Sequence, residues 1–311
     1  MSSPKSRYRP AVETCERRVA LSTGVSANTL AVVNGVVQTP QSRAAASFPV
    51  TARNINRRHS VILGASVRAN EGSALVPAVT HAQGASGESI PLRQGVPASA
   101  RHQRPTHVYL RTGEPGSVTT EVTGREGTTG GFQLNATLPG DLDGDGQVTL
   151  ADETLFVDSF GSTRGNANYL PAADANQNGQ IGQGDARFLL RNLRPLTPKV
   201  PLSLTLNLSP HDAAKGPTPK TSGGKTHHKN VTILGHTTPG SLIFLDAGLG
   251  DFSFGGAAVA ADARGNFAIR VTNKEGLTNY NFLAIDPYGQ QVIRVYPVFW
   301  LNFAASGFGL K

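Results

Sequence analysis

Two twelve-residue segments near the middle of the chain repeat one pattern, and this repeat constrains the fold more than any other feature. Residues 141–152 read DLDGDGQVTLAD, and residues 174–185 read DANQNGQIGQGD. In both segments oxygen-bearing side chains alternate around a central glycine, Gly146 or Gly179. Calcium takes roughly six to eight oxygen ligands, and a loop supplies them when side chains at alternate positions turn inward. The repeat therefore predicts two calcium-binding loops.

The first loop is the more acidic of the two. Its predicted ligands are Asp141, Asp143, Asp145, Gln147, Thr149 and Asp152. Gln147 stands where the backbone carbonyl coordinates, and Thr149 stands where a side chain or a water bridges. Gly146 occupies the sharp turn, which favours a residue without Cβ. Because four carboxylates repel one another until a cation joins them, we expect this loop to bind calcium more tightly than the second loop.

The second loop repeats the plan with fewer charges. Its predicted ligands are Asp174, Asn176, Asn178, Gln180 and Asp185. Gly182 takes the ninth position, so a water is expected to complete the coordination there. Val148 and Ile181 hold the matching apolar positions, and we expect them to pair the loops through a short strand contact. An Asp- and Gly-rich turn that binds nothing is the alternative, but two loops in register disfavour it.

A helix-compatible run follows each closing aspartate. Residues 153–160 read ETLFVDSF, and residues 186–193 read ARFLLRNL. Their apolar residues are spaced for one buried helix face each. The central segment therefore predicts two units, each a calcium loop followed by one helix.

A duplicated calcium loop with one following helix, and without the leading helix of a full EF-hand, resembles a type I dockerin over residues 139–195. Dockerins attach enzymes or surface proteins to cohesin domains, so the resemblance implies a cohesin-type protein partner. The family's recognition residues precede the closing acid and are often small hydroxyl pairs. Here these positions hold Leu150–Ala151 and Gln183–Gly184. This departure leaves a purely structural role of the module as the alternative.

The rest of the chain is expected to be mainly β, because Val, Thr, Gly and Ser are frequent and only 16% of residues are charged. Short apolar runs separated by turn residues are typical of β-sandwiches. We expect one Ig-like β-sandwich domain at residues 56–138 and a second at residues 196–311, flanking the small α module. The predicted strand runs lie at 59–69, 73–82, 106–112, 116–124, 131–138, 230–236, 241–248, 266–272, 279–286 and 291–301.

The C-terminal region resembles bacterial Ig-like repeats of adhesins. The residues that carry the resemblance are TTPGSLIFLDAG at 237–248, ADARGNFAIRV at 261–271 and NYNFLAIDPYGQ at 279–290. The turn from Asp262 to Gly265 followed by Asn266–Phe267 matches the turn-then-strand pattern of those repeats. The resemblance implies an Ig-like sandwich and an extracellular protein.

The first 55 residues are polar and basic, and we expect a disordered tail there. Within it, VETCERRVALS at 12–22 resembles the LEPR-XLL segment near the N-terminus of large bacterial surface proteins, which implies export. No apolar run of ~7–15 residues near the start marks a signal peptide, and no run of ~18 marks a transmembrane helix. Cys15 is the only cysteine, which excludes an intrachain disulfide.

The net charge of +8 is spread along the chain without interleaved aromatics, so we expect no nucleic-acid partner. No G-x-S-x-G, P-loop or H-E-x-x-H motif occurs, and we expect no enzymatic activity. His227 and His228, flanked by Lys225 and Lys229, lack a third ligand at fixed spacing and are interpreted as a solvated loop.

The pattern as a whole predicts a calcium-binding structural or adhesive protein, extracellular or on the cell surface. A non-catalytic accessory subunit of a polysaccharide-degrading assembly, docked through a cohesin, is the alternative. The expected partners are accordingly a cohesin-type protein or an extracellular polysaccharide.

Overall fold

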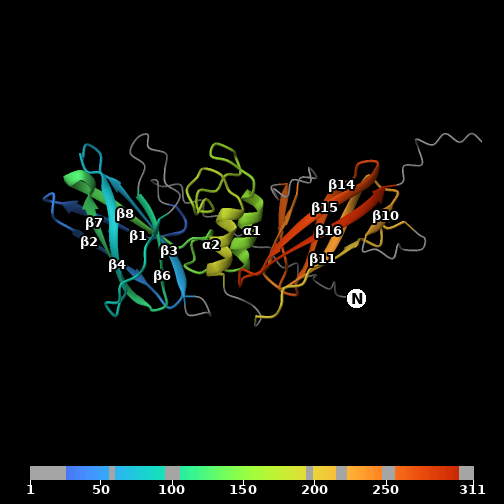
Figure 1. Ribbon diagram of the computed structural model, residues 1–311, viewed down its shortest axis with the longest axis horizontal. Coiled ribbons are helices and arrows are strands. Elements are labelled where there is room, and N and C mark those ends of the chain that lie inside the picture. The colour runs from blue at the N-terminus through green and yellow to red at the C-terminus, as the bar shows by residue number, and fades with distance from the viewer. Residues whose placement is uncertain are drawn as a thin grey trace, which may run out of the picture.

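A computed structural model describes residues 26–55, 60–94, 106–193, 199–214, 223–246 and 256–300. It is mainly β, with two α-helices, α1 at Leu150–Ser159 and α2 at Gln183–Asn192, and one 3-10 turn, η1 at Arg125–Gly127. Two β units lie on either side of the helices (Figure 1). The predicted mainly β architecture is therefore confirmed.

The first β unit contains eight strands in two sheets. The five-stranded sheet has the order β1 (Thr29–Val37), β8 (Gly130–Thr137), β3 (Val61–Ala69), β6 (Thr106–Thr112) and β5 (Arg93–Gln94), and the three-stranded sheet has the order β2 (Ala44–Val50), β7 (Gly116–Gly124) and β4 (Pro77–Gln83). The antiparallel pairs β1–β8, β2–β7 and β3–β6 nest inside one another, as in a jelly roll. This order differs from that of Ig domains, so the prediction of an Ig-like arrangement for this unit is wrong.

Two strands of this unit lie in the segment that was expected to be a disordered tail. β1 and β2 belong to residues 1–55, and they pair along their whole lengths with β8 and β7. In β2 the side chains of Ala46, Phe48 and Val50 are buried while their neighbours are exposed. This period of two is that of a half-buried strand, and the alanines and Pro49 of β2 give the alternation little contrast in the sequence. The predicted boundary at residue 55 is therefore wrong, and the LEPR-XLL-like segment at 12–22 lies outside the described residues.

The second β unit also consists of two sheets. One has the order β10 (Gly224–Thr226), β16 (Gln291–Trp300), β15 (Gly276–Ile285), β12 (Leu242–Leu245) and β13 (Ala257–Ala260), and the other has the order β14 (Asn266–Thr272), β11 (Asn230–His236) and β9 (Thr205–Leu208). Among the pairs formed here, β10 and β16 are parallel and the others are antiparallel. Val231, Ile233, Ile243, Phe282 and Val298 are among the side chains buried between the sheets.

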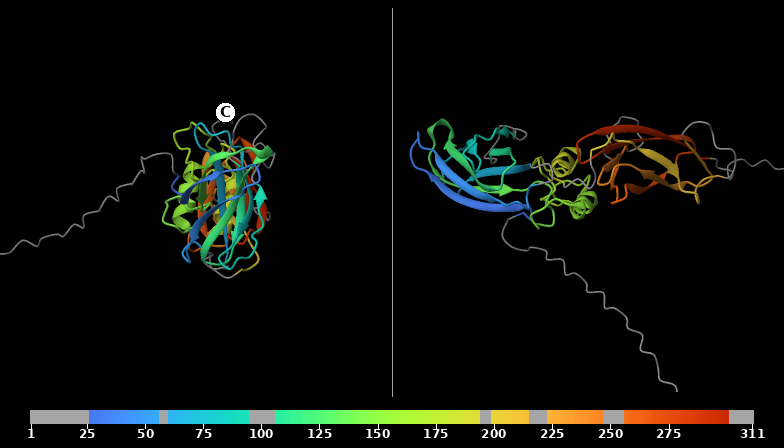
Figure 2. Two further views of the ribbon diagram at one scale, coloured as in Figure 1. Left: turned by 90° about the vertical axis from the view of Figure 1, so that its left-hand side faces the viewer. Right: turned by 90° about the horizontal axis from the view of Figure 1, so that it is seen from below.

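The helices join the two units through one apolar core. The buried cluster of the first unit continues through Phe156, Leu189 and Leu190 of the helices. It then reaches Leu242 and Phe244 of the second unit. The right-hand view of Figure 2 shows the helices between the two β units. The central segment is therefore an internal connector, with apolar contacts on two sides.

Candidate metal centre

The first predicted loop folds around the carboxylate of Asp141, which is 2% exposed. Its Oδ1 accepts a hydrogen bond from the backbone N–H of Gly144 (2.9 Å), and its Oδ2 accepts one from Gly146 (3.0 Å). Carboxylate oxygens of Asp141, Asp143 and Asp145 lie within 4.8 Å of one another. The structure thus brings the first three predicted ligands together.

The closing residue, Asp152, is fully buried and ties the two ends of this loop together. Its Oδ1 accepts from the backbone N–H of Leu142 (2.6 Å), and its Oδ2 accepts from Thr149 (2.7 Å). The Oγ1 of Thr149 accepts from the backbone N–H of Ala151, so Thr149 caps helix α1 and forms a capping box with Asp152. The predicted helix is present, but it spans Leu150–Ser159 rather than 153–160, because the Thr149 cap starts it within the last residues of the loop segment.

The second loop repeats five of the backbone-to-side-chain hydrogen bonds of the first, but not those from Leu142 to Asp152 and from Gly144 to Asp141. In each loop, backbone N–H groups donate the repeated bonds to side chains of the same loop. The donors in loop 1 are Gly146, Asp145, Gln147, Thr149 and Asp143, and the corresponding donors in loop 2 are Gly179, Asn178, Gln180, Gly182 and Asn176. The acceptors change from Asp143 and Asp145 to Asn176 and Asn178, with Oδ1 in the same role. The two loops are therefore structural repeats in which amides replace two carboxylates.

Positive backbone φ angles occur at corresponding places in both loops. The sixth residues, Gly146 and Gly179, have φ of 83° and 89°, in the left-handed region that favours glycine. The fourth residue is Gly144 in loop 1 and Gln177 in loop 2, where a non-glycine residue has φ of 58°. The prediction of a sharp turn at the sixth position is confirmed.

Burial, together with neighbouring carboxylates, raises the pKa values of three aspartates in the loops. Burial, then the nearby Asp152 carboxylate, raises the pKa of Asp141 to about 7. Burial raises the pKa of Asp152 to about 6, and burial with the Asp174 carboxylate raises the pKa of Asp185 to about 6. Burying several carboxylates side by side is unfavourable while they are charged, and a bound cation would remove that cost.

Glu153, directly after the closing aspartate, is a buried acid that the sequence analysis did not single out. Its side chain is 0% exposed, and neither carboxylate oxygen has a hydrogen-bond partner. Burial and the neighbouring Asp152 raise its pKa well above the usual value for glutamate. The only sequence signal is a second acid at the start of an apolar helix.

The expected strand contact between the two loops forms elsewhere. Val148 and Ile181 are both buried, but the backbone of Ile181 pairs with the segment after α1. Its carbonyl accepts from Gly161 N–H (2.9 Å), and its N–H donates to the carbonyl of Ser162 (2.9 Å). The prediction that Val148 and Ile181 pair as strands is therefore wrong, because the helix-to-loop connection occupies the backbone of Ile181.

Polar contacts fix the central module to the first β unit. The Nδ2 of Asn192 donates to the carbonyls of Ile62 and Pro139, and its Oδ1 accepts from Ile62 N–H, all at 2.8 Å. The Nδ2 of Asn54 donates to the carbonyl of Gly146 (2.8 Å), which belongs to the first loop. The first loop is thus hydrogen-bonded to a β unit far from it in sequence.

Apolar contacts fix the other side of the module to the second unit. The ring of Phe160, at the end of α1, lies 5.2 Å from that of Phe244 on β12. A Cβ placed on Gly240 would lie 3.3 Å from side-chain carbons of both Leu150 and Leu193. Leu150 therefore faces the second β unit of its own chain.

Comparisons with known proteins leave the family open. No protein-family model and no curated protein matches the chain. A crystal structure of a Corynebacterium diphtheriae protein proposed to be membrane anchored aligns with a TM-score of 0.20 and 9% identity, over 87% of this chain and 59% of that one. A TM-score of this size does not establish a common fold. Among the described residues, no helix has the length and hydropathy needed to cross a membrane.

Proposed function

We propose that this chain is an extracellular or cell-surface structural protein in which a dockerin-like module binds two calcium ions and holds two β units in a fixed arrangement. The observation that carries the proposal is the set of backbone hydrogen bonds shared by the two loops. They hold the carboxylates of Asp141 and Asp152 in the first loop, and those of Asp174 and Asp185 in the second, with the same backbone donors.

The donor set favours calcium over softer cations. Residues 141–152 and 174–185 contain carboxylate, amide, hydroxyl and backbone oxygens and neither histidine nor cysteine. Such all-oxygen sites suit hard cations, whereas imidazole and thiolate select zinc and copper. The loops also allow the irregular, many-liganded shell that calcium accepts and magnesium resists.

The contacts of the helices favour an internal structural role over docking. Leu150 faces Gly240 of the second β unit, and Phe188 of α2 stacks on Tyr109 of the first. Much of the apolar surface of the module is therefore covered by its own chain. A calcium ion that orders the first loop would then also order the contact between this loop and the first β unit, because Asn54 links the two.

The strand order of the second unit supports an Ig-like assignment and hence an extracellular location. β9, β11 and β14 correspond to strands A, B and E of an Ig domain, and β12, β15 and β16 correspond to strands C, F and G. Domains of this architecture are common on cell surfaces. An adhesive role would use the outer faces of the two β units.

Calorimetric titration of the full chain with calcium tests the proposal. We expect two binding events in the parent chain, one in Asp141→Asn and one in Asp174→Asn. Asp158→Asn is the matched control, because Asp158 is an exposed acid on α1 outside both loops. Calcium binding in the double variant Asp141→Asn/Asp174→Asn that equals the parent's would overturn the assignment.

A cohesin-docked accessory subunit is the second candidate, and one observation favours it. One face of α1 carries three exposed residues, Ala151, Thr154 and Asp158. Arg187 of α2 is also exposed. A pull-down with a panel of cohesin domains, in calcium and in chelator, separates the two functions. Calcium-dependent capture would support docking, and lack of capture in both conditions would support the internal role.

A further inference from the structure

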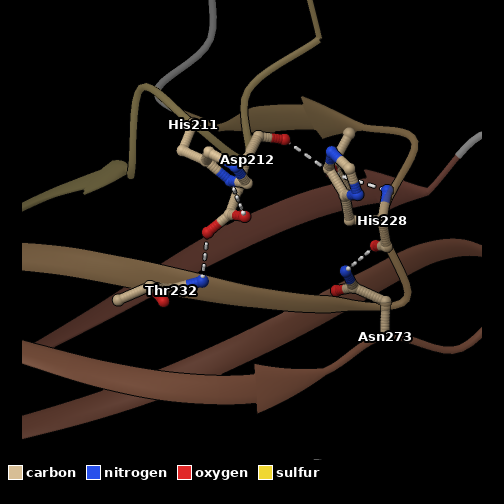
Figure 3. Close-up of polar contacts among 6 residues, drawn as sticks. His211, Asp212, His228, Thr232 and Asn273 are labelled. Carbon is tan, nitrogen blue, oxygen red and sulfur yellow. Dashed lines mark hydrogen bonds and ion pairs between the residues drawn. The ribbon is translucent and has the colours of Figure 1, made fainter.

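Two histidines from separate segments of the second β unit lie side by side (Figure 3). His211 belongs to the turn after β9, and His228 follows β10. Their ring centroids are 5.9 Å apart, with an angle of 24° between the planes. The fold thus brings His211, a histidine outside the local sequence of His227 and His228, next to the ring of His228.

Asp212 holds one of the two rings in place. Its Oδ1 lies 3.3 Å from Nδ1 of His211, and its Oδ2 accepts a hydrogen bond from the backbone N–H of Thr232 on β11 (2.8 Å). The Asp212 side chain is 13% exposed, whereas that of His211 is 87% exposed. A carboxylate anchored on a strand therefore binds one nitrogen of an accessible imidazole and leaves Nε2 facing solvent.

Buried polar side chains hold the backbone on both sides of the second ring. The N–H of His228 donates to Oγ1 of Thr226 (3.0 Å), and its carbonyl accepts from Nδ2 of Asn273 (3.2 Å). Thr226, which is 0% exposed, also donates to the carbonyl of Asp212 (2.6 Å). These bonds connect the backbones that carry both histidines, as the dashed lines in Figure 3 show. The pair is therefore held by a common framework.

We propose that His211 and His228 together bind one first-row transition-metal cation, with Asp212 as the positioning residue for His211. Neutral imidazole is a preferred ligand of Cu²⁺, Ni²⁺ and Zn²⁺, and a ligating histidine usually donates its second N–H to a carboxylate or carbonyl. A ring nitrogen lies about 2 Å from such a metal, which allows two ring centroids to be roughly 6 Å apart. Water completes the coordination.

This site differs in chemistry and position from the calcium loops. Its ligands are nitrogens, and its affinity order should follow Cu²⁺ above Ni²⁺ and Zn²⁺, with no response to Ca²⁺. Lys225 and Lys229 flank His227 and His228, so the neighbourhood carries positive charge, and binding must come from the imidazoles rather than from a general electrostatic attraction. A transition-metal site here would add a second metal chemistry to a protein proposed to use calcium.

Copper titration of the full chain in saturating calcium tests the proposal, with Cu²⁺ alone as the probe. Calcium keeps the oxygen loops filled, and pulsed electron paramagnetic resonance counts the imidazoles on each copper. We expect two imidazoles in the parent chain and one in His211→Asn and His228→Asn, each with an association constant lowered at least ~10-fold. His236→Asn, on β11, is the matched control and should behave like the parent chain.

Asp212→Asn tests the positioning role, because an amide oxygen can still accept the hydrogen bond from Thr232. We expect two imidazoles per copper with an association constant lowered by about 10-fold. An unchanged constant in Asp212→Asn would overturn the positioning role. A two-imidazole signal of unchanged affinity in both histidine variants would overturn the site and assign the copper to other histidines of the chain.

Discussion

The ring of Tyr109 on β6 stacks on the ring of Phe188 in α2, with centroids 4.3 Å apart and planes inclined by 25°. The hydroxyl of the same tyrosine donates a hydrogen bond to the carbonyl of Ala175, inside the second predicted loop (2.7 Å). One side chain of the first β unit therefore contacts both a helix and a loop of the central module. This contact makes the central module part of the core of the first β unit rather than a separate domain.

Substitution of Tyr109 should destabilise the whole chain. Tyr109→Ala removes a large buried ring and should lower the free energy of unfolding by about 3–5 kcal/mol. Tyr109→Phe keeps the stack and loses the hydrogen bond to Ala175, so a loss of about 1 kcal/mol is expected. Urea unfolding in saturating calcium measures both. Equal losses in the two variants would show that the stack contributes little.

Calcium should shift the unfolding of both the module and the first β unit together. At ~100 times the dissociation constant, a ligand adds about 2.7 kcal/mol to the folded state. Because Asn192 ties α2 to Ile62 and Pro139, differential scanning calorimetry should show the module and this unit in one calcium-shifted transition.

Asn192→Ala tests this coupling, because it leaves three buried backbone groups without their partner. We expect the shared transition to broaden or divide in this variant, while Arg187→Ala, an exposed position on the same helix, retains it. A parent chain whose first β unit melts at the same temperature in calcium and in chelator would contradict the coupling.

The stability of the calcium-free chain should rise as the pH falls from about 7 toward 5. The folded-state pKa of Asp141 is about 7 against an ordinary value of 3.8, and those of Asp152 and Asp185 are about 6. The folded state therefore binds more protons than the unfolded state in this range, and its stability is lost as the pH rises. Thermal unfolding in chelator across this range measures the effect.

Saturating calcium should reverse the sign of this dependence, because protons then compete with the cation for the same carboxylates. Asp141→Asn is the matched variant, since it removes the group with the highest of the three pKa values. Its profile in chelator should be flatter than that of the parent chain. A parent profile that is flat in chelator would show that these carboxylates do not titrate as the structure indicates.

Glu153→Met should stabilise the chain at neutral pH. The buried carboxyl group has no hydrogen-bond partner, so replacing it with an apolar side chain of similar length removes a desolvation cost of about 1–3 kcal/mol. Glu153→Gln keeps a buried polar group and should give no such gain. Chemical denaturation in saturating calcium at pH 7 compares the three chains. A less stable Met variant would indicate that the carboxyl group supports the adjacent Asp152.

The loops and helices of the central module followed from sequence because their causes are local. The side chains of Asp141 and Asp152 bond to backbone groups within the same twelve residues, and Thr149 begins the helix that follows. Most later strands were also predictable, because runs such as Val61–Ala69 show their apolar residues directly. Calcium itself stays a prediction that rests on the oxygen donors of both loops.

Tertiary structure decided what depends on distant partners. β1 and β2 lie in a segment whose basic composition predicted a tail, and they are strands because β8 and β7 supply their hydrogen bonds and core. The stack of Phe188 on Tyr109 and the pairing of His211 with His228 join segments that no local pattern relates. The sequence alone determined which oxygen-bearing side chains the two loops present. The packing of the two β units determined whether the module is free to dock, because burial depends on which surfaces meet and not on the residues of one segment.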